Sequence, residues 1–351
     1  MRAIVHIGNH KTGTTSIQGF LSANRMRLRD QGYLYPARLH HHQTDPDLPD
    51  HNQLAFHLAY ATLCDFLTPL RRELEAAGCH TLLLSAEVMA SHLASVPLVE
   101  RLRQFLQQLG CDEIRIVVWL RESGAMFASL CAQSLHDGHP DYAERLPPAA
   151  CPRLHPVMDH RALLQRFGQV FGRQALRVRL FERECWPQGE LLRDAAAAFE
   201  LAWDEHFVLP APSNERLSLL EMEVLRAANH LTAGQCWASA TPRGILFAAL
   251  HRHLGALQDP QLRFVPPQAV TAAWRQWAAE GNEWVRQEFF PERAALFAPP
   301  PEEEEHYELS VMKPQWWEAL GRTLAELSGE VAALRRELRR VQTGGGGAPP
   351  P

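Results

Sequence analysis

Short apolar runs alternate with longer amphipathic segments through the first half of the chain. The apolar runs at 3–7, 81–85, 114–120 and 175–181 have the length and composition of buried β-strands. Between them, apolar residues recur every three or four positions, which predicts helices at 15–31, 53–77, 96–110, 125–137 and 160–172. Gly78, Gly110 and Gly172 each follow one of these segments, where the end of a helix favours a residue that tolerates positive φ. Strands that alternate with helices in this way predict an α/β fold, in which helices flank a parallel sheet.

The second half of the chain has a different pattern. From residue 191 onward the apolar spacing is mainly helical, so we expect a helical C-terminal half. This division predicts one domain at 1–297, made of a sheet-containing core at 1–185 and a helical part at 186–297. A stretch at 298–313 that is rich in Pro and Glu has the composition of a linker.

The segment 314–342 carries apolar residues spaced alternately by three and four. They are Trp317, Leu320, Leu324, Leu327, Val331, Leu334, Leu338 and Val341. This spacing is typical of a coiled coil, which would join two copies of the chain into a homodimer. It is equally compatible with an amphipathic helix that packs on the chain's own domain, and both alternatives stay open. Residues 343–351, rich in Gly and Pro, are expected to be a disordered tail.

Composition narrows the class of protein. The 35 basic and 40 acidic residues give a formal net charge of -5, which does not indicate a nucleic-acid partner. Seven cysteines without a Cys-x-x-Cys pair are typical of reduced thiols rather than a disulfide framework. The N-terminal apolar run is too short for a signal peptide, and no run approaches the ~20 apolar residues of a membrane helix. We therefore expect a cytoplasmic protein that is not an integral membrane protein.

The segment 8–16, GNHKTGTTS, follows the first predicted strand and leads into a helix. The segment combines the N-H groups of a helix N-terminus with two glycines and a lysine, which is typical of an anion site. An ordinary helix cap would need neither the two glycines nor the lysine. A Walker A loop aligned on Lys11 and Thr12 requires glycines where the chain has Val5 and His10. A dinucleotide fingerprint that begins at Gly8 also requires glycine at position 10. Both of these nucleotide-binding motifs are therefore excluded.

The segment resembles instead the 5′-phosphosulfate loop of sulfotransferases that use 3′-phosphoadenosine-5′-phosphosulfate (PAPS). In that family a lysine precedes one or two small residues, a glycine and two or three hydroxyl residues. The matching residues here are Lys11, Thr12, Gly13, Thr14, Thr15 and Ser16. Further residues match a bacterial, carbohydrate-type subgroup: Gly32, Tyr35, Pro36, Ser85, Glu87, Asn214, Leu217 and Ser218. The resemblance implies a P-loop-like sulfotransferase fold in which residues 1–185 bind the nucleotide.

The same family has a second signature, an arginine at a strand end with a serine eight residues later on the next helix. Arg121 and Ser129 stand at this separation here. The resemblance implies that their guanidinium and hydroxyl groups bind one phosphate of PAPS in the crevice beyond the sheet. The Arg-Lys-Gly-x-x-Gly segment that closes over the nucleotide in animal cytosolic sulfotransferases has no counterpart in this chain.

Sulfuryl transfer requires charge stabilisation and a general base. Lys11 would neutralise the charge on the leaving 5′-phosphate, while Glu87 is the first candidate for the base and His51 the second. The acceptor stays open among saccharides, lipid-linked sugars, peptides and small molecules. No metal is expected, because the adjacent His40, His41 and His42 cannot all face one ion in regular structure.

Two alternatives remain. A kinase with an irregular phosphate loop would turn over ATP with magnesium, but the sequence lacks the Walker glycines and a clear strand that ends in aspartate. A non-catalytic protein that retains a nucleotide fold to present its C-terminal helix would not need to keep Lys11, Arg121 and Ser129.

Overall fold

The computed structural model describes residues 1–37, 50–60, 64–139, 146–210, 217–231, 242–257, 259, 262–299 and 312–344. The chain divides into two compact units. Unit 1 comprises Met1–Leu130, Ala143–Asn214 and Pro267–Glu303, and unit 2 comprises Cys131–Tyr142, Glu215–Pro266 and Glu304–Pro351. The boundaries expected from the sequence at 185, 297 and 313 stay predictions.

Unit 1 is built on a five-stranded parallel sheet in the order β2-β3-β1-β4-β5. The strands are β1 (Arg2–His6), β2 (Tyr33–Leu34), β3 (Thr81–Ser85), β4 (Glu113–Leu120) and β5 (Leu176–Leu180). Four of them coincide with the four predicted strands. The fifth, β2, has two residues and is too short to produce an apolar run. The α/β class expected from the sequence is confirmed.

Helices connect the strands and cover the sheet. In unit 1 they are α1 (Thr14–Ala23), α2 (Arg25–Asp30), α3 (Asn52–Tyr60), α4 (Cys64–Ala77), α5 (Met89–His92), α6 (Val96–Gln108), α8 (His155–Met158), α9 (His160–Phe171), α10 (Leu191–Ala198) and α13 (Gln268–Phe289). Helix α7 (Ser123–His136) begins in unit 1. Short 3₁₀ segments lie at Pro148–Ala150, Pro152–Leu154, Arg173–Ala175, Arg183–Cys185 and Pro187–Gly189. Gly78, Gly110 and Gly172 have φ values of 63°, 80° and 82°, which confirms the predicted role of glycine after α4, α6 and α9.

One predicted helix, 15–31, is wrong as a continuous element. It is divided into α1 and α2 at Asn24. The Asn24 side chain donates to the carbonyls of Phe20 and Val208 and accepts the N-H of Val208. Such bonds between a side chain and the backbone compete with helix continuation. The predicted helix at 53–77 contains α3 and α4, and residues 61–63 between them lie outside the described part.

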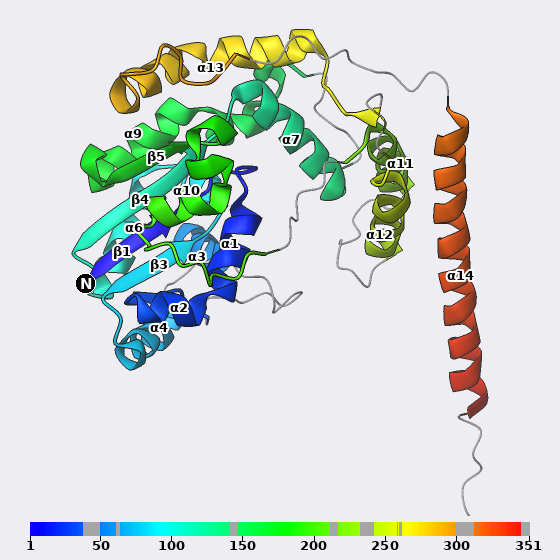
Figure 1. Cartoon of the computed structure of the whole chain (residues 1–351), viewed down its shortest axis with the longest axis horizontal. Coiled ribbons are helices and arrows are strands. Elements are labelled where there is room, and N and C mark those ends of the chain that lie inside the picture. The colour runs from blue at the N-terminus through cyan, green and yellow to red at the C-terminus, as the bar shows by residue number, and fades with distance from the viewer. Residues whose placement is uncertain are drawn as a thin grey trace, which may run out of the picture. The chain divides into compact units, whose positions relative to one another are not determined.

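The sheet of unit 1 lies between two helical layers (Figure 1). On one face, side chains of β1, β3 and β4 pack against α3, α4, α6, α9 and α13, and on the other against α1, α2 and α10. Along β1 the side chains alternate, so that Ala3 and Val5 contact the first layer and Ile4 the second. The sequence of a strand that is buried on both faces is a continuous apolar run, and for this reason these strands could be predicted.

Unit 2 contains α11 (Leu219–Leu231), α12 (Pro242–Leu254) and α14 (Pro314–Gly344) around a core of its own. Helix α11 begins with a capping box, in which the Ser218 hydroxyl accepts the N-H of Glu221 and the Glu221 carboxylate accepts the N-H of Ser218. Helix α14 packs on α12 through Trp316 and Ala319, and Glu326 pairs with His253. The helical C-terminal half is confirmed.

The apolar seam predicted along α14 is only partly buried in unit 2. Trp317, Leu324, Val331 and Leu334 are all exposed, with Leu324 at 64%. Leu320 is half-buried against α12 and its neighbours. Helix α14 therefore packs on its own unit and also carries an exposed apolar stripe with heptad spacing. The homodimer stays a prediction.

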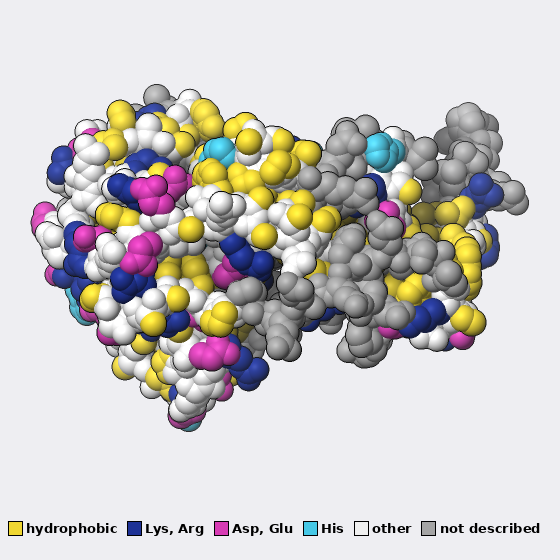
Figure 2. Space-filling view, turned by 90° about the horizontal axis from the view of Figure 1, so that it is seen from above, with side chains coloured by type: hydrophobic (Ala, Val, Ile, Leu, Met, Phe, Trp, Pro, Cys, Tyr) yellow, Lys and Arg dark blue, Asp and Glu magenta, His cyan; other side chains and the backbone are white. Residues whose placement is uncertain are grey.

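Basic and acidic side chains lie intermixed on the face of the molecule shown in Figure 2. Among the described residues, no helix is long and apolar enough to cross a membrane.

Candidate phosphate-binding site

The phosphate loop, residues 8–16, lies at the centre of the sheet's carboxyl edge. It follows β1, which pairs with β3 on one side and with β4 on the other. From β1 the chain goes to β2 and β3 on one side, whereas β4 leads to β5 on the other. Neighbouring strands whose connections diverge in this way leave a crevice at their carboxyl ends, where open α/β sheets bind ligands.

The backbone of the loop takes conformations that glycine favours. Gly8, Lys11 and Gly13 have φ values of 101°, 57° and 74°. A Cβ atom on Gly8 would meet the carbonyl oxygen of Glu87 at 2.5 Å, and one on Gly13 would meet the Leu191 side chain at 2.3 Å. Glycine at position 8 is therefore required by close packing against backbone as well as by conformation, whereas at position 13 the positive φ is the main reason for glycine. The N-H groups of Asn9, His10 and Lys11 bond to protein acceptors, so the N-H groups of the loop that can face an anion are those at the start of α1.

The loop ends at the N-terminus of α1. Gly13 occupies the N-cap position, where it supplies no side-chain cap, and the first turn of α1 contains no acidic residue. The positive end of the helix dipole is therefore not compensated by a side chain of its own first turn. Thr14 is buried and Thr15 is exposed. The Thr12 hydroxyl donates to the Asn9 carbonyl at 2.6 Å, which fixes the turn from inside.

Lys11 is held on both sides by residues that follow neighbouring strands. Its N-H donates to Oε1 of Glu87, beyond β3, at 3.1 Å. Its carbonyl accepts from Nη1 of Arg121, beyond β4, at 2.7 Å. The Arg121 guanidinium also lies over the Phe181 ring, 5.3 Å from its centroid. The structure thus brings three of the predicted site residues together, Lys11, Glu87 and Arg121.

Ser129 lies on α7 and is half-buried. Helix α7 begins at Ser123, where the Glu122 carboxylate accepts the N-H groups of Gly124 and Ala125. Arg275 of α13 pairs with the same carboxylate at 2.9 Å and holds this helix start against α13. The structure does not test the shared phosphate contact predicted for Ser129 and Arg121.

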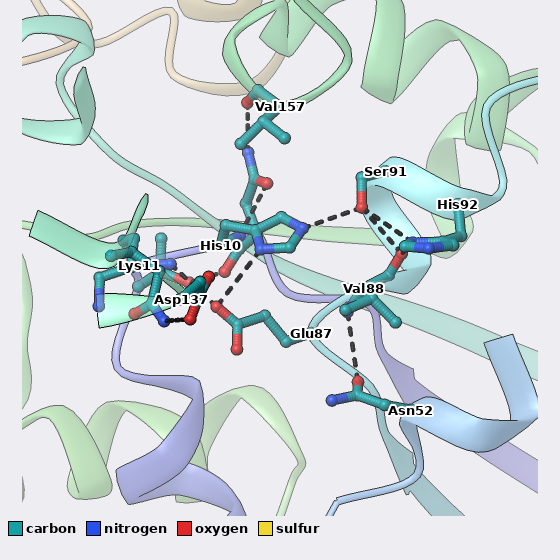
Figure 3. A network of polar contacts seen from close by, with 12 residues as sticks. His10, Lys11, Asn52, Glu87, Val88, Ser91, His92, Asp137 and Val157 are labelled. Atoms are coloured by element: carbon teal, nitrogen blue, oxygen red, sulfur yellow. Dashed lines mark hydrogen bonds and ion pairs between the residues drawn. The ribbon is translucent and has the colours of Figure 1, made fainter. Parts of the chain in front are cut away.

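A polar network joins the loop to α5, and its central residue is His10 (Figure 3). Nδ1 of His10 lies 3.6 Å from Oε1 of Glu87, and Nε2 lies 2.9 Å from Oγ of Ser91. The side chains of His10 and Glu87 are each 23% exposed. In the sequence, His10 served only to exclude two motifs. A histidine within a phosphate loop was the signal that could have marked it as a candidate site residue.

His51, the second candidate for the base, is fully buried. Its Nδ1 accepts the N-H of Ser85 at 3.1 Å, and its Nε2 lies 3.1 Å from the Pro36 carbonyl. Its ring packs against Tyr35 at a centroid distance of 4.5 Å. Both ring nitrogens are engaged with the backbone, which fixes one neutral tautomer. This geometry favours a structural role in joining 35–36 to the end of β3.

A second buried imidazole, His6, lies at the end of β1 under the loop. Nδ1 of His6 is 2.8 Å from the Ser85 hydroxyl, and the Trp119 ring contacts it edge-on at 5.1 Å. Complete burial penalises the charged form and lowers the pKa of His6 to about 3. The imidazole beneath the loop is therefore neutral at physiological pH.

The triple histidine 40–42 and Asn214 lie outside the described residues. Within the part of the chain that is described, no group of three or more His, Cys, Asp or Glu side chains is arranged to hold a metal ion.

Comparison with known proteins gives one structural likeness. A crystal structure of a sulfotransferase from Alicyclobacillus acidocaldarius matches with a TM-score of 0.35 and 17% sequence identity, over 65% of this chain and 92% of that chain. At this level of similarity the likeness adds nothing to an assignment of function. No protein-family model matches the sequence, and no curated protein matches it.

Proposed function

We propose that the protein is a sulfotransferase that moves a sulfuryl group from PAPS to a hydroxyl or amine of an acceptor, such as a saccharide or glycoconjugate. The observation that carries the proposal is the phosphate loop. Its sequence combines Lys11 and Gly13 with three successive hydroxyl residues, and it lies between β1 and α1 at the switch point of the sheet.

The loop and the N-terminus of α1 suit the 5′-phosphosulfate end of PAPS. Gly8 lets the loop pack directly against the Glu87 backbone, where any side chain would clash. N-H groups at an uncapped helix start and the ammonium of Lys11 would bind the phosphate that becomes the leaving group. They stabilise charge that grows as the bond between sulfur and the bridging oxygen breaks.

Arg121 and Ser129 are proposed to bind the 3′-phosphate of the donor. Arg121 lies beside the loop, and a guanidinium suits a phosphate because its N-H groups form paired hydrogen bonds. The reaction requires in-line approach of the acceptor and does not require a metal ion.

The donor assignment is tested by calorimetry with adenosine 3′,5′-bisphosphate (PAP), the product of the donor. We expect PAP to bind without magnesium and more than tenfold more tightly than AMP, because only PAP carries the 3′-phosphate. Lys11→Ala should reduce the rate of PAP release from PAPS more than it weakens PAP binding. Lys313→Ala, which removes a lysine paired with Asp259 in unit 2, serves as the matched control. Equal affinities for PAP and AMP would contradict the role of Arg121, and an unchanged rate would remove Lys11 from the mechanism.

A further inference from the structure

We propose that His10, and not Glu87, is the general base that takes the proton from the acceptor, and that Glu87 orients it. This inference rests on the proposed sulfuryl transfer and assigns the acceptor side of the same site. It starts from the contacts of the His10 ring, which lies between Glu87 and Ser91 in Figure 3.

The neighbours of His10 determine which ring nitrogen carries the proton. A carboxylate only accepts hydrogen bonds, so Glu87, whose Oε1 lies 3.6 Å from Nδ1 in an ion-pair contact, favours a proton on that nitrogen. Nε2 then has a lone pair and accepts from the Ser91 hydroxyl at 2.9 Å. The opposite tautomer would direct a lone pair at the carboxylate. The Ser91 hydroxyl can also donate to the Val88 carbonyl at 3.1 Å, but that carbonyl already accepts the backbone N-H and Nδ1 of His92, which leaves the Ser91 proton available for Nε2 of His10.

A hydroxyl that donates to Nε2 is the arrangement that an acceptor needs. The acceptor hydroxyl would take the place that the Ser91 hydroxyl has on Nε2 of His10. The N-terminus of α1, where the leaving phosphate is proposed to bind, begins on the other side of Lys11 in the chain. The base and the leaving-group site thus lie within the same loop, residues 8–16.

Glu87 is less suited to be the base itself. Its Oε1 already accepts the N-H of Lys11 and faces His10, so this atom is committed to holding the loop. Imidazole is the side chain whose ordinary pKa lies nearest to neutral pH, which suits proton transfer under physiological conditions. A carboxylate beside Nδ1 fixes the tautomer and stabilises the imidazolium that forms, as in other base and carboxylate pairs.

The proposed step transfers the sulfuryl group and one proton. The acceptor oxygen forms a bond to sulfur, its proton passes to Nε2 of His10, and the bond between sulfur and the 5′-phosphate oxygen breaks. The electron pair of that bond leaves with PAP. The imidazolium, held against Glu87, then releases its proton to water.

The test uses the full chain with PAPS, a mixture of saccharide acceptors, and water as the minimal acceptor. His10→Ala and His10→Gln should each lower the rate of PAP release by about 100-fold or more. PAP affinity should stay within about threefold of wild type, and free imidazole should restore part of the rate of His10→Ala. His10→Gln keeps a polar side chain of similar reach, so it retains a contact to Ser91 if the alanine variant does not fold. His206→Ala, which changes an exposed histidine outside the site, is the matched control and should keep the wild-type rate within about threefold.

A second measurement does not depend on turnover. In protein labelled with ¹⁵N-histidine, the signal lost in His10→Gln should be that of a neutral ring protonated on Nδ1, and Glu87→Gln should shift it. Activity in the His10 variants within tenfold of wild type, or a ring protonated on Nε2, would overturn the inference and leave the proposed function intact. A wild-type protein that neither binds PAP nor releases it from PAPS would overturn both.

Discussion

The buried imidazole of His6 makes stability depend on pH in a way that can be calculated. His6 is fully buried beneath the phosphate loop, and burial lowers its pKa to about 3. In the unfolded chain the same side chain has an ordinary pKa of about 6.5. Between these values the unfolded state binds one more proton than the folded state.

The sign and size of the effect follow from this difference. Stability is fully present above the pKa of the unfolded chain and is lost as the pH falls from there toward the folded pKa. One pH unit corresponds to about 1.4 kcal/mol, so acidification from pH 7 to pH 5 should cost about 2 kcal/mol through His6 alone. This is a large share of the roughly 5–15 kcal/mol of a typical domain.

His6→Asn isolates this contribution. The amide can still bond the Ser85 hydroxyl but does not titrate, and any cost of the smaller side chain is the same at both pH values. Urea unfolding at pH 7 and pH 5 should show that wild type loses about 2 kcal/mol more than the variant. The same measurement on His206→Asn, which changes an exposed histidine, serves as the control. His160, whose pKa burial also lowers, is present in all three proteins and cancels. Equal losses in wild type and His6→Asn would refute the reasoning.

Two further predictions concern the loop and the C-terminal helix. Gly8→Ala and Gly110→Ala both place a side chain at positive φ, which should lower the free energy of unfolding by about 1–2 kcal/mol each. Only at Gly8 does a backbone oxygen also lie 2.5 Å from the new Cβ. Denaturation and calorimetry should therefore show greater destabilisation and at least tenfold weaker PAP binding for Gly8→Ala alone, and equal behaviour would contradict the packing argument. Replacement of the exposed Leu324 and Val331 by Lys should convert a dimer to a monomer in light scattering without loss of helix content. A wild-type protein that is already monomeric would rule out the coiled-coil dimer.

The sheet was predictable because its strands are short, apolar and buried on both faces, as Ile4 and Val5 show by facing opposite layers. The ends of several helices were predictable because Gly78, Gly110 and Gly172 have the positive φ that the sequence pattern implied. The break at Asn24 was not predictable from apolar spacing, since it depends on hydrogen bonds to Val208, 184 residues away.

The sequence pointed to individual candidate residues of the site but not to how they lie relative to one another. The loop sequence indicated an anion site, and the strand ends indicated Arg121 and Glu87. His10 was missed because its neighbour Ser91 is 81 residues away and approaches only when β1 and β3 pair with His6 opposite Ser85. His51 stays an untested candidate for the base; only the fold shows that both of its ring nitrogens contact the backbone.

The contacts of Lys11 also determine how mutations of its neighbours should be interpreted. A non-glycine residue at positive φ is strained by about 1–3 kcal/mol, and Lys11 is held there by Glu87 at its N-H and Arg121 at its carbonyl. Removal of either side chain would relax the loop before it removed any group from the reaction. A slower Glu87 variant is therefore no evidence that Glu87 is the base, since weaker donor binding is expected as well. His10 contacts Glu87 and Ser91 through its ring alone, so its substitution separates proton transfer from the shape of the loop.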